Sequence, residues 1–292
     1  MNFKLLCFLT LALTIGFVSC SDDDETTSGT ETLTVDVRGL ENLGAGYAYE
    51  GWVMIDGAPV TTGVFTVNDD GDLSQSTFDV PRLADATTFI LTIEPSPDND
   101  PAPSAVHLVA GDFSGNTANL DVGHGAALAN DFEASTGKFI LATPTDSDDT
   151  NEYSGVWFQD NSSGSPVAGL DLPTLPEGWI YEGWAVIDGS PVTTGKFLSV
   201  SGADQAAPFS GPNGGPAYPG EDYLINAPAG KTFPINLAAA VISIEPVPDN
   251  SDAPFLLKPL VGMIDANAEV HTTLPMGNNA VNTNPTGTVT RN

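Results

Sequence analysis

The chain has 292 residues, with 38 acidic against 8 basic side chains and a formal net charge of −30 at pH 7. A charge of this sign repels nucleic acids and anionic lipid surfaces, so we expect no nucleic-acid partner. The 23 prolines and 30 glycines would interrupt helices along the whole chain, which favours β-structure.

Residues 1–19 have the pattern of an export leader. Lys4 precedes an apolar run, Leu5–Val18, that is too short for a typical membrane span. The run leads into Phe17-Val-Ser-Cys20, which resembles the lipobox of bacterial lipoproteins and implies that Cys20 becomes the lipidated first residue. The alternative is a secretory leader with an incidental cysteine. Cys7 is the only other cysteine and lies inside the leader, so no disulfide requires Cys20.

Residues 20–32 form an acidic tether that starts with Ser21-Asp-Asp-Asp-Glu25. It resembles the surface-export signal of outer-membrane lipoproteins in some Gram-negative bacteria, and the alternative is a solvated linker. Either interpretation predicts a protein of the cell envelope, held at the outer membrane through its lipid. The resemblance favours the cell surface.

Two sequence blocks occur twice in the same order, which indicates a duplicated domain. Tyr49–Gly63 recurs as Tyr181–Gly195, and Ile93–Asn99 recurs as Ile244–Asn250. The first pair is offset by 132 positions (181 − 49) and the second by 151 (244 − 93), so the second copy has 19 extra residues between its blocks. We place them in the Gly- and Pro-rich segment Gly202–Ala229, which predicts an inserted loop without strands.

Strand patterns are frequent between these blocks. Leu33–Val37 alternates apolar and polar residues, and Tyr49–Ile55 is apolar on both faces, as in a covered central strand. Further strands are expected at Val64–Val67, Thr88–Ile93, Val106–Val109, Lys138–Ala142 and Tyr153–Phe158. We therefore predict an all-β fold of two tandem antiparallel β-sandwiches, spanning residues 33–134 and 135–292.

Each copy combines a tryptophan strand, a Gly-x-Pro-Val-x-x-Gly turn and a later Ile-Glu-Pro motif. These features are Trp52, Gly57–Gly63 and Thr92–Pro95 in the first copy, and Trp184, Gly189–Gly195 and Ser243–Pro246 in the second. The combination resembles the C-terminal extracytoplasmic domain of anti-sigma-K factors of the RskA type, over Leu40–Ala110 and Leu172–Val261. The resemblance implies the fold of that outer domain. An exported chain cannot reach a sigma factor, so we expect no sigma-factor contact.

The repeated motifs carry four glutamates: Glu50, Glu94, Glu182 and Glu245. Paired carboxylates facing one cleft are the apparatus of glycosidases. The alternative is structural, because a carboxylate at a strand end accepts backbone N–H groups that an X-Pro turn leaves unpaired. We favour the structural role for these framework residues and expect a non-enzymatic protein without a resident cofactor.

The acidic turns of the sequence suggest a candidate calcium-binding site. The candidate ligands are Asp98, Asp100, Asp249 and Asp252, which flank the Pro-Asp-Asn turns of both copies. Carboxylate oxygens suit Ca²⁺, but the spacing matches no EF-hand loop. Asp and Asn also dominate turns through local hydrogen bonds, which explains the same residues without metal.

Large aromatic residues mark the same strand in both copies. Trp52 and Trp184 are expected in the core, whereas Tyr47 and Trp179, at the strand entries, form a candidate exposed ligand surface. We expect a role in ligand binding or envelope sensing, towards an unidentified protein or glycan. A carbohydrate-binding surface lipoprotein and a secreted glycan hydrolase are the alternatives.

Overall fold

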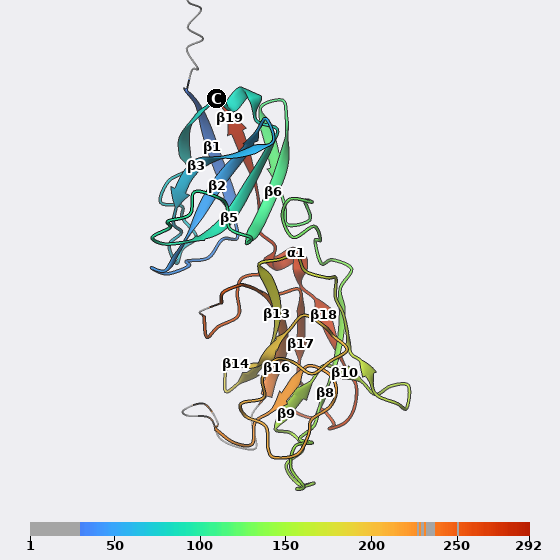
Figure 1. The fold of residues 1–292 in the computed structure, drawn as a ribbon. Coiled ribbons are helices and arrows are strands. Elements are labelled where there is room, and N and C mark those ends of the chain that lie inside the picture. The colour runs from blue at the N-terminus through green and yellow to red at the C-terminus, as the bar shows by residue number, and fades with distance from the viewer. Residues whose placement is uncertain (1–29, 227, 229–230, 232–236, 250) are drawn as a thin grey trace, which may run out of the picture.

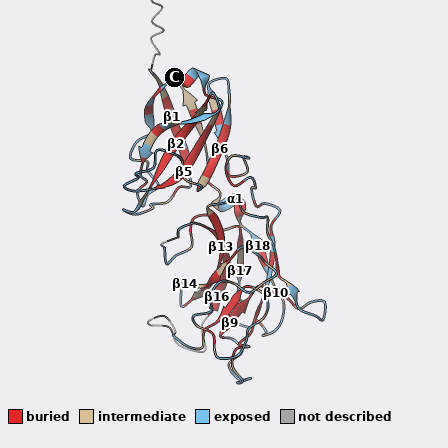
Figure 2. Ribbon diagram, viewed as in Figure 1, coloured by how far each residue is buried: buried red, intermediate tan, exposed pale blue. Residues whose placement is uncertain are grey.

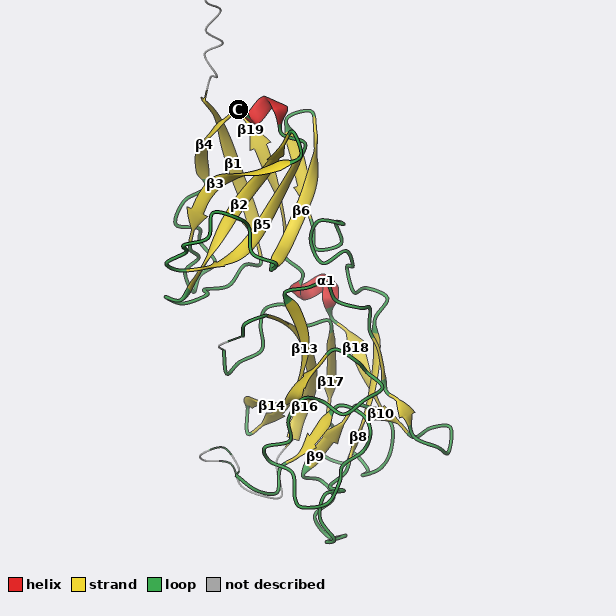
Figure 3. Ribbon diagram, in the orientation of Figure 1, coloured by secondary structure: helices red, strands yellow, loops and turns green. Residues whose placement is uncertain are grey.

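The computed structural model describes residues 30–226, 228, 231, 237–249 and 251–292. Nearly all regular structure in this part of the chain is β-strand (Figure 3), which confirms the predicted all-β fold. The predicted leader, Cys20 and most of the tether lie outside the described residues. Among the residues described, none of the helices combines the length and apolar character needed to cross a membrane.

One antiparallel sheet builds what we call the first module. Its strand order is β3-β2-β5-β6-β7-β19-β1-β4. The bounds are β1 Thr30–Arg38, β2 Tyr47–Ile55, β3 Ala58–Phe65, β4 Thr77–Pro81, β5 Thr88–Pro95, β6 His107–Ser114, β7 Thr117–Leu120 and β19 Thr286–Arg291, with a 3-10 turn, η1, at Leu83–Asp85. The sheet curls until its two end strands, β3 and β4, lie against each other, so two layers enclose a core.

A second antiparallel sheet builds the second module, in the order β14-β13-β16-β17-β18-β8-β9-β15. The bounds are β8 Thr136–Leu141, β9 Gly155–Trp157, β13 Trp179–Ile187, β14 Ser190–Phe197, β15 Gly220–Asp222, β16 Leu237–Pro246, β17 Leu260–Met263 and β18 Leu274–Asn278. A further short strand of this sheet, β12 Leu170–Asp171, pairs with β8, and β10 Gln159–Asp160 and β11 Val167–Ala168 form a separate two-stranded sheet. A short helix, α1 (Ala280–Thr283), lies between the modules (Figure 1).

The two modules repeat the same construction around their central strands. β2 and β13 are buried along most of their length (Figure 2). Each leads into a hairpin whose two turn residues, Asp56-Gly57 or Asp188-Gly189, have positive φ. Two such residues form the type I′ turn, for which Asp-Gly is a preferred pair.

A β-bulge interrupts both central strands at the motif Gly-Trp. The register of β2 against β3 shifts between Gly51 and Trp52, and that of β13 against β14 shifts between Gly183 and Trp184. A Cβ on Gly51 would lie 2.3 Å from Thr62 Oγ1. The motif glycine is therefore required by close packing at the bulge.

Three expectations differ from the structure. Only Val64 and Phe65 of the predicted strand Val64–Val67 belong to β3, which starts earlier, at Ala58, and ends at Phe65. The predicted strand-free insertion contains β15, because Gly220–Asp222 pairs with β9 at the sheet edge. The predicted second domain included Thr286–Arg291, yet this strand, β19, pairs with β1 and β7 in the first module (Figure 1).

Candidate functional site

The two framework glutamates that precede proline, Glu94 and Glu245, bind the chain segment that leads into the neighbouring strand. Glu94 accepts the backbone N–H of Ser104 at 2.8 Å, and Glu245 accepts that of Phe255 at 2.9 Å. A hydroxyl group, from Thr92 or its counterpart in the second module, also donates to each carboxylate. Both glutamates are buried, so these bonds replace the water that burial removes.

The motif tryptophans extend the same chain of hydrogen bonds. Trp52 Nε1 donates to Thr92 Oγ1 at 2.9 Å, and Trp184 Nε1 donates to Ser243 Oγ at 2.7 Å. Each tryptophan is no more than 3% exposed. The ring is buried and its one donor is satisfied, so both residues serve the framework, as the sequence predicts for the core.

The other pair of framework glutamates binds the hairpin. Thr61 donates to Glu50 and Thr193 donates to Glu182. The modules differ beside this pair, because Val64 in the first copy is replaced by Lys196 in the second. Lys196 Nζ lies 2.8 Å from an oxygen of Asp249 and 3.7 Å from Oε2 of Glu182.

Three carboxylates therefore gather in the second module around one ammonium group. Oxygens of Glu182, Glu245 and Asp249 lie within 4.8 Å of one another. Burial raises the pKa of Glu182 and of Glu245 to about 7, because removal from water disfavours the charged form. Protonation of Glu182 and Glu245 below about pH 7 and the charge of Lys196 together limit repulsion among the oxygens of the cluster.

The candidate calcium ligands do not come together. Asp98 and Asp100 are exposed in the first module, where their side chains accept the backbone N–H groups of Asp100 and Ala102. Asp252 is exposed in the second module. Of the four, Asp249 alone belongs to a carboxylate group within the described ranges. Local turn hydrogen bonds account for Asp98 and Asp100.

The two residues of the candidate aromatic surface, Tyr47 and Trp179, differ in their exposure to solvent. Trp179 is 2% exposed, and its ring centroid lies 5.9 Å from that of Phe255, so it is not available for stacking on a ligand. The prediction of an exposed pair is wrong for Trp179 because the chain after the Pro-Asp-Asn turn folds over it. Tyr47 is half-buried and lines a cleft.

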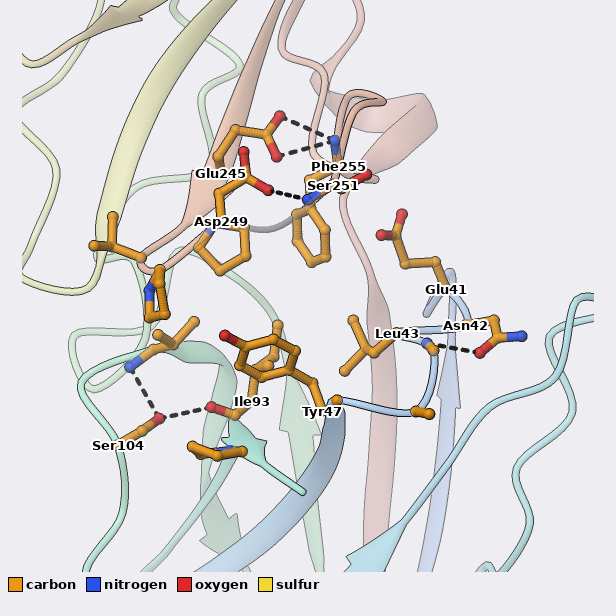
Figure 4. Close-up of a pocket in the computed structure, with 18 residues that line it drawn as sticks. Glu41, Asn42, Leu43, Tyr47, Ile93, Ser104, Glu245, Asp249, Ser251 and Phe255 are labelled. Atoms are coloured by element: carbon orange, nitrogen blue, oxygen red, sulfur yellow. Dashed lines mark hydrogen bonds between the residues drawn. The ribbon is translucent and has the colours of Figure 1, made fainter. Parts of the chain in front are cut away.

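That cleft lies where the two modules meet and has a volume of about 420 Å³. Figure 4 shows Tyr47, Leu43 and Ile93 of the first module facing Phe255, Glu245 and Asp249 of the second. The remaining apolar side chains of the lining are Ala45, Pro95, Val106, Pro246, Val247 and Pro248. An apolar concave surface with a few polar groups is the usual form of a binding site.

The cleft also carries titratable groups from both modules. Glu41 lines it, and burial raises the pKa of this carboxyl to about 6, while the nearby Lys258 ammonium acts in the opposite direction. Burial lowers the pKa of Lys258. Glu245 and Asp249 belong to the opposite wall. The cleft is therefore apolar in its lining and becomes more negative as pH rises through 6 and 7.

A second hollow, of about 660 Å³, adjoins the cleft on the second module. Glu182, Lys196 and Asp252 line it, and it shares Asp249 and Ser251 with the cleft. Asp249 and Ser251 therefore lie between two adjacent hollows. The sequence marked the turn at Asp249 as a repeated block, but the loop that supplies Glu41 and Leu43 has no counterpart motif.

Comparison with known proteins gives one match. The family model described as "Anti-sigma-K factor rskA, C-terminal" matches residues 25–107. The match covers the first copy of the repeated blocks and supports the resemblance there, over less than half of the chain. No curated protein and no solved structure matches the chain.

Proposed function

We propose that this chain is a lipid-anchored, non-enzymatic protein of the outer membrane that binds a ligand in the cleft between its modules. The observation that carries the proposal is the cleft itself, which takes apolar side chains and carboxylates from both modules. The match to an extracytoplasmic domain over residues 25–107 supports a location outside the cytoplasm.

The lining indicates the chemistry of the ligand. Apolar walls favour a hydrophobic body, and Glu41, Glu245 and Asp249 favour a positive group beside it. A segment of a partner protein that pairs an aromatic side chain with lysine or arginine has both properties. The formal charge of −30 attracts such a segment from a distance.

The binding test uses the tripeptide Lys-Phe-Lys as probe and Glu-Phe-Glu as its charge-reversed control. We expect NMR shifts at the cleft with the first peptide only, and tighter binding as pH rises, because Glu41 and Glu245 lose protons near pH 6 and 7. Tyr47→Ala should weaken binding about tenfold by removing one aromatic contact.

Tyr153→Ala is the matched control, since Tyr153 is 48% exposed and does not line the cleft. Equal binding of the two peptides, or equal effects of the two tyrosine substitutions, would contradict a cationic-apolar ligand.

A carbohydrate is the second candidate ligand, because the exposed part of Tyr47 offers one aromatic face in the cleft. A glycan array with wild type and Tyr47→Ala distinguishes the two. Glycan binding that Tyr47→Ala abolishes, without any response to Lys-Phe-Lys, would favour the carbohydrate.

The anchor is tested separately at Cys20. Cys20→Ser should move the protein from the membrane to the soluble fraction, because one thioether-linked diacylglycerol and an amide-linked chain bury enough CH₂ groups for stable attachment. Mass spectrometry of the wild-type N-terminus should detect the acyl chains. An unmodified N-terminus in membrane-associated protein would contradict lipidation.

A further inference from the structure

β8 and β19 occupy the same position in their respective sheets. In the first module the strand between β7 and β1 is β19, and in the second module the strand between β18 and β9 is β8. All other strands of each sheet come from one continuous part of the chain. In chain order, however, β8 directly follows β7, and β19 follows β18. Each strand therefore completes the module of the other repeat.

The pairing register is the same for both strands. On one side, Gly287 lies opposite Leu120 of β7, and Gly137 lies opposite Met276 of β18. Two residues further along, Val289 is paired with Ala118, and this pair corresponds to Phe139 with Leu274.

The pairing register on the other edge of β8 and β19 shows the same correspondence. Thr290 lies opposite Thr34 of β1, and Ile140 lies opposite Trp157 of β9. The next pair is Arg291 with Leu33, which corresponds to Leu141 with Val156. A register that agrees on both edges identifies the two strands as counterparts, since a slip by one residue would invert every side chain.

The sequence supports the same correspondence. Both strands begin with Thr-Gly, at Thr136 and Thr286, which are 150 positions apart (286 − 136). The nearest repeated block, Ile93 and Ile244, is offset by 151 (244 − 93). β8 is thus the last strand of the first repeat, and β19 is the last strand of the second.

The two segments that cross between the modules are bound to each other. Residues 121–135 lead out of the first module and residues 279–285 lead back. In the returning segment, Asn284 Nδ2 donates to Asp131 O at 2.7 Å. Asn278, the last residue of β18, donates through Nδ2 to Phe132 O at 2.8 Å and to Ser135 O at 2.9 Å.

We propose that the two repeats have exchanged their final strands, and that the same exchange joins two copies of this chain, with β19 of one copy completing the first module of the other. The groove between β1 and β7 makes identical contacts whichever copy supplies the strand. Only the seven residues 279–285 (285 − 279 + 1) link β19 to its own second module. Exchange of an identical element is a low-cost route to dimers.

The experiment uses the 292-residue chain with Cys7→Ser and Cys20→Ser, so that no native thiol remains. Thr34→Cys with Thr290→Cys reports β19 in the first module, because these residues are directly opposite and opposed Cα atoms lie within disulfide range. Thr34→Cys with Ile140→Cys reports β8 in its own repeat. The protein is unfolded, refolded and then oxidised at about 10 µM and at about 1 mM, the latter near the effective concentration of a short linker.

We expect the Thr34/Thr290 pair to form an intrachain disulfide at the lower concentration, and disulfide-linked dimers in a several-fold greater share at the higher one. The Thr34/Ile140 pair should not close within one chain. An intrachain Thr34/Ile140 disulfide would overturn the exchange, and purely intrachain Thr34/Thr290 disulfides at both concentrations would overturn the pairing of copies.

Two controls keep the result interpretable. Asp36→Cys with Thr288→Cys joins the same strands at a second opposed pair and serves if the first variant does not fold. Thr34→Cys with Thr286→Cys places the thiols four residues out of register, since Thr286 lies opposite Arg38, and it should form neither product.

Discussion

The framework carboxylates show how one residue type takes different hydrogen-bond partners within this fold. Glu94 and Glu245 accept backbone N–H groups at equivalent positions, which the sequence indicated through the Glu-Pro motif. The carboxylate cluster of the second module could not be predicted in the same way, because Lys196 and Asp249 meet only after β14 and the turn following β16 are packed together.

Glu221 in β15 gives a pH-dependent prediction. Its side chain is buried, accepts a hydrogen bond from Ser210 and leaves Oε2 unpaired within the described residues. Burial raises its pKa from 4.5 to about 7. The folded state therefore keeps a proton that the unfolded state releases, so this group's contribution is fully present below pH 4.5 and is lost as pH rises through 7.

Glu221→Gln removes that loss. We expect the free energy of unfolding to rise by about 3 kcal/mol at alkaline pH and to change little in acid, because the pKa rises from 4.5 to about 7 and each unit is worth about 1.4 kcal/mol. Urea titrations at about pH 5 and about pH 8 measure the difference. Glu269→Gln, on an exposed residue of the same module, should show no such pH dependence. An equal effect of Glu221→Gln at both pH values would contradict a buried proton.

The strands that the sequence predicts best are those with strong local patterns. Tyr49–Ile55 is apolar on both faces and forms the covered strand β2, and Thr88–Ile93 falls within β5. β15 was missed because Gly220–Asp222 has no apolar alternation. Its ladder depends on pairing with β9 from a distant part of the chain, which no local pattern reports.

The bulge in β2 provides a prediction for this element. Gly51→Ala should destabilise the protein by about 2 kcal/mol, the usual range for an added methyl group in a filled core. The added Cβ would lie 2.3 Å from Thr62 Oγ1 and 2.9 Å from the ring of Phe89. Chemical denaturation measures the loss.

Gly125→Ala is the control, because a Cβ there has nothing within 4 Å. If both alanine variants were equally stable, the close packing at the bulge would not be what requires glycine.

For the whole molecule, the duplicated sequence predicted two modules, but it did not predict that the last strand, β19, belongs to the first module. Thr286–Arg291 has the sequence of a polar strand that suits either module. Its place is decided by pairing with β1, more than 240 residues earlier in the chain, and by the contacts of Arg291. That side chain donates to the carbonyl groups of Leu83 and Ala84 and lies over the ring of Phe113.

Removal of residues 284–292 tests this arrangement. The first module should lose cooperative unfolding, because the facing edges of β1 and β7 would be left unpaired. Hydrogen exchange should show loss of protection in β1 and β7, with β13 and β16 less affected.

A matched variant keeps the length of the chain but shuffles the order of the six residues Thr286–Arg291, which changes the pairing pattern of this strand. Full protection of β1 in the truncated chain would contradict a structural need for β19.

The position of β19 at the C-terminal end of the chain also affects the order in which the two modules can fold during synthesis. A polypeptide is synthesised from its N-terminus, so the strands from β1 to β7 are available early while residues 286–291 are still to come. The sheet of the first module consequently cannot close with its own β19 until the whole of the second module has emerged. Folding of the first module thus waits for the last segment to be synthesised. A chain that ends anywhere before Thr286 leaves the facing edges of β1 and β7 without a strand between them.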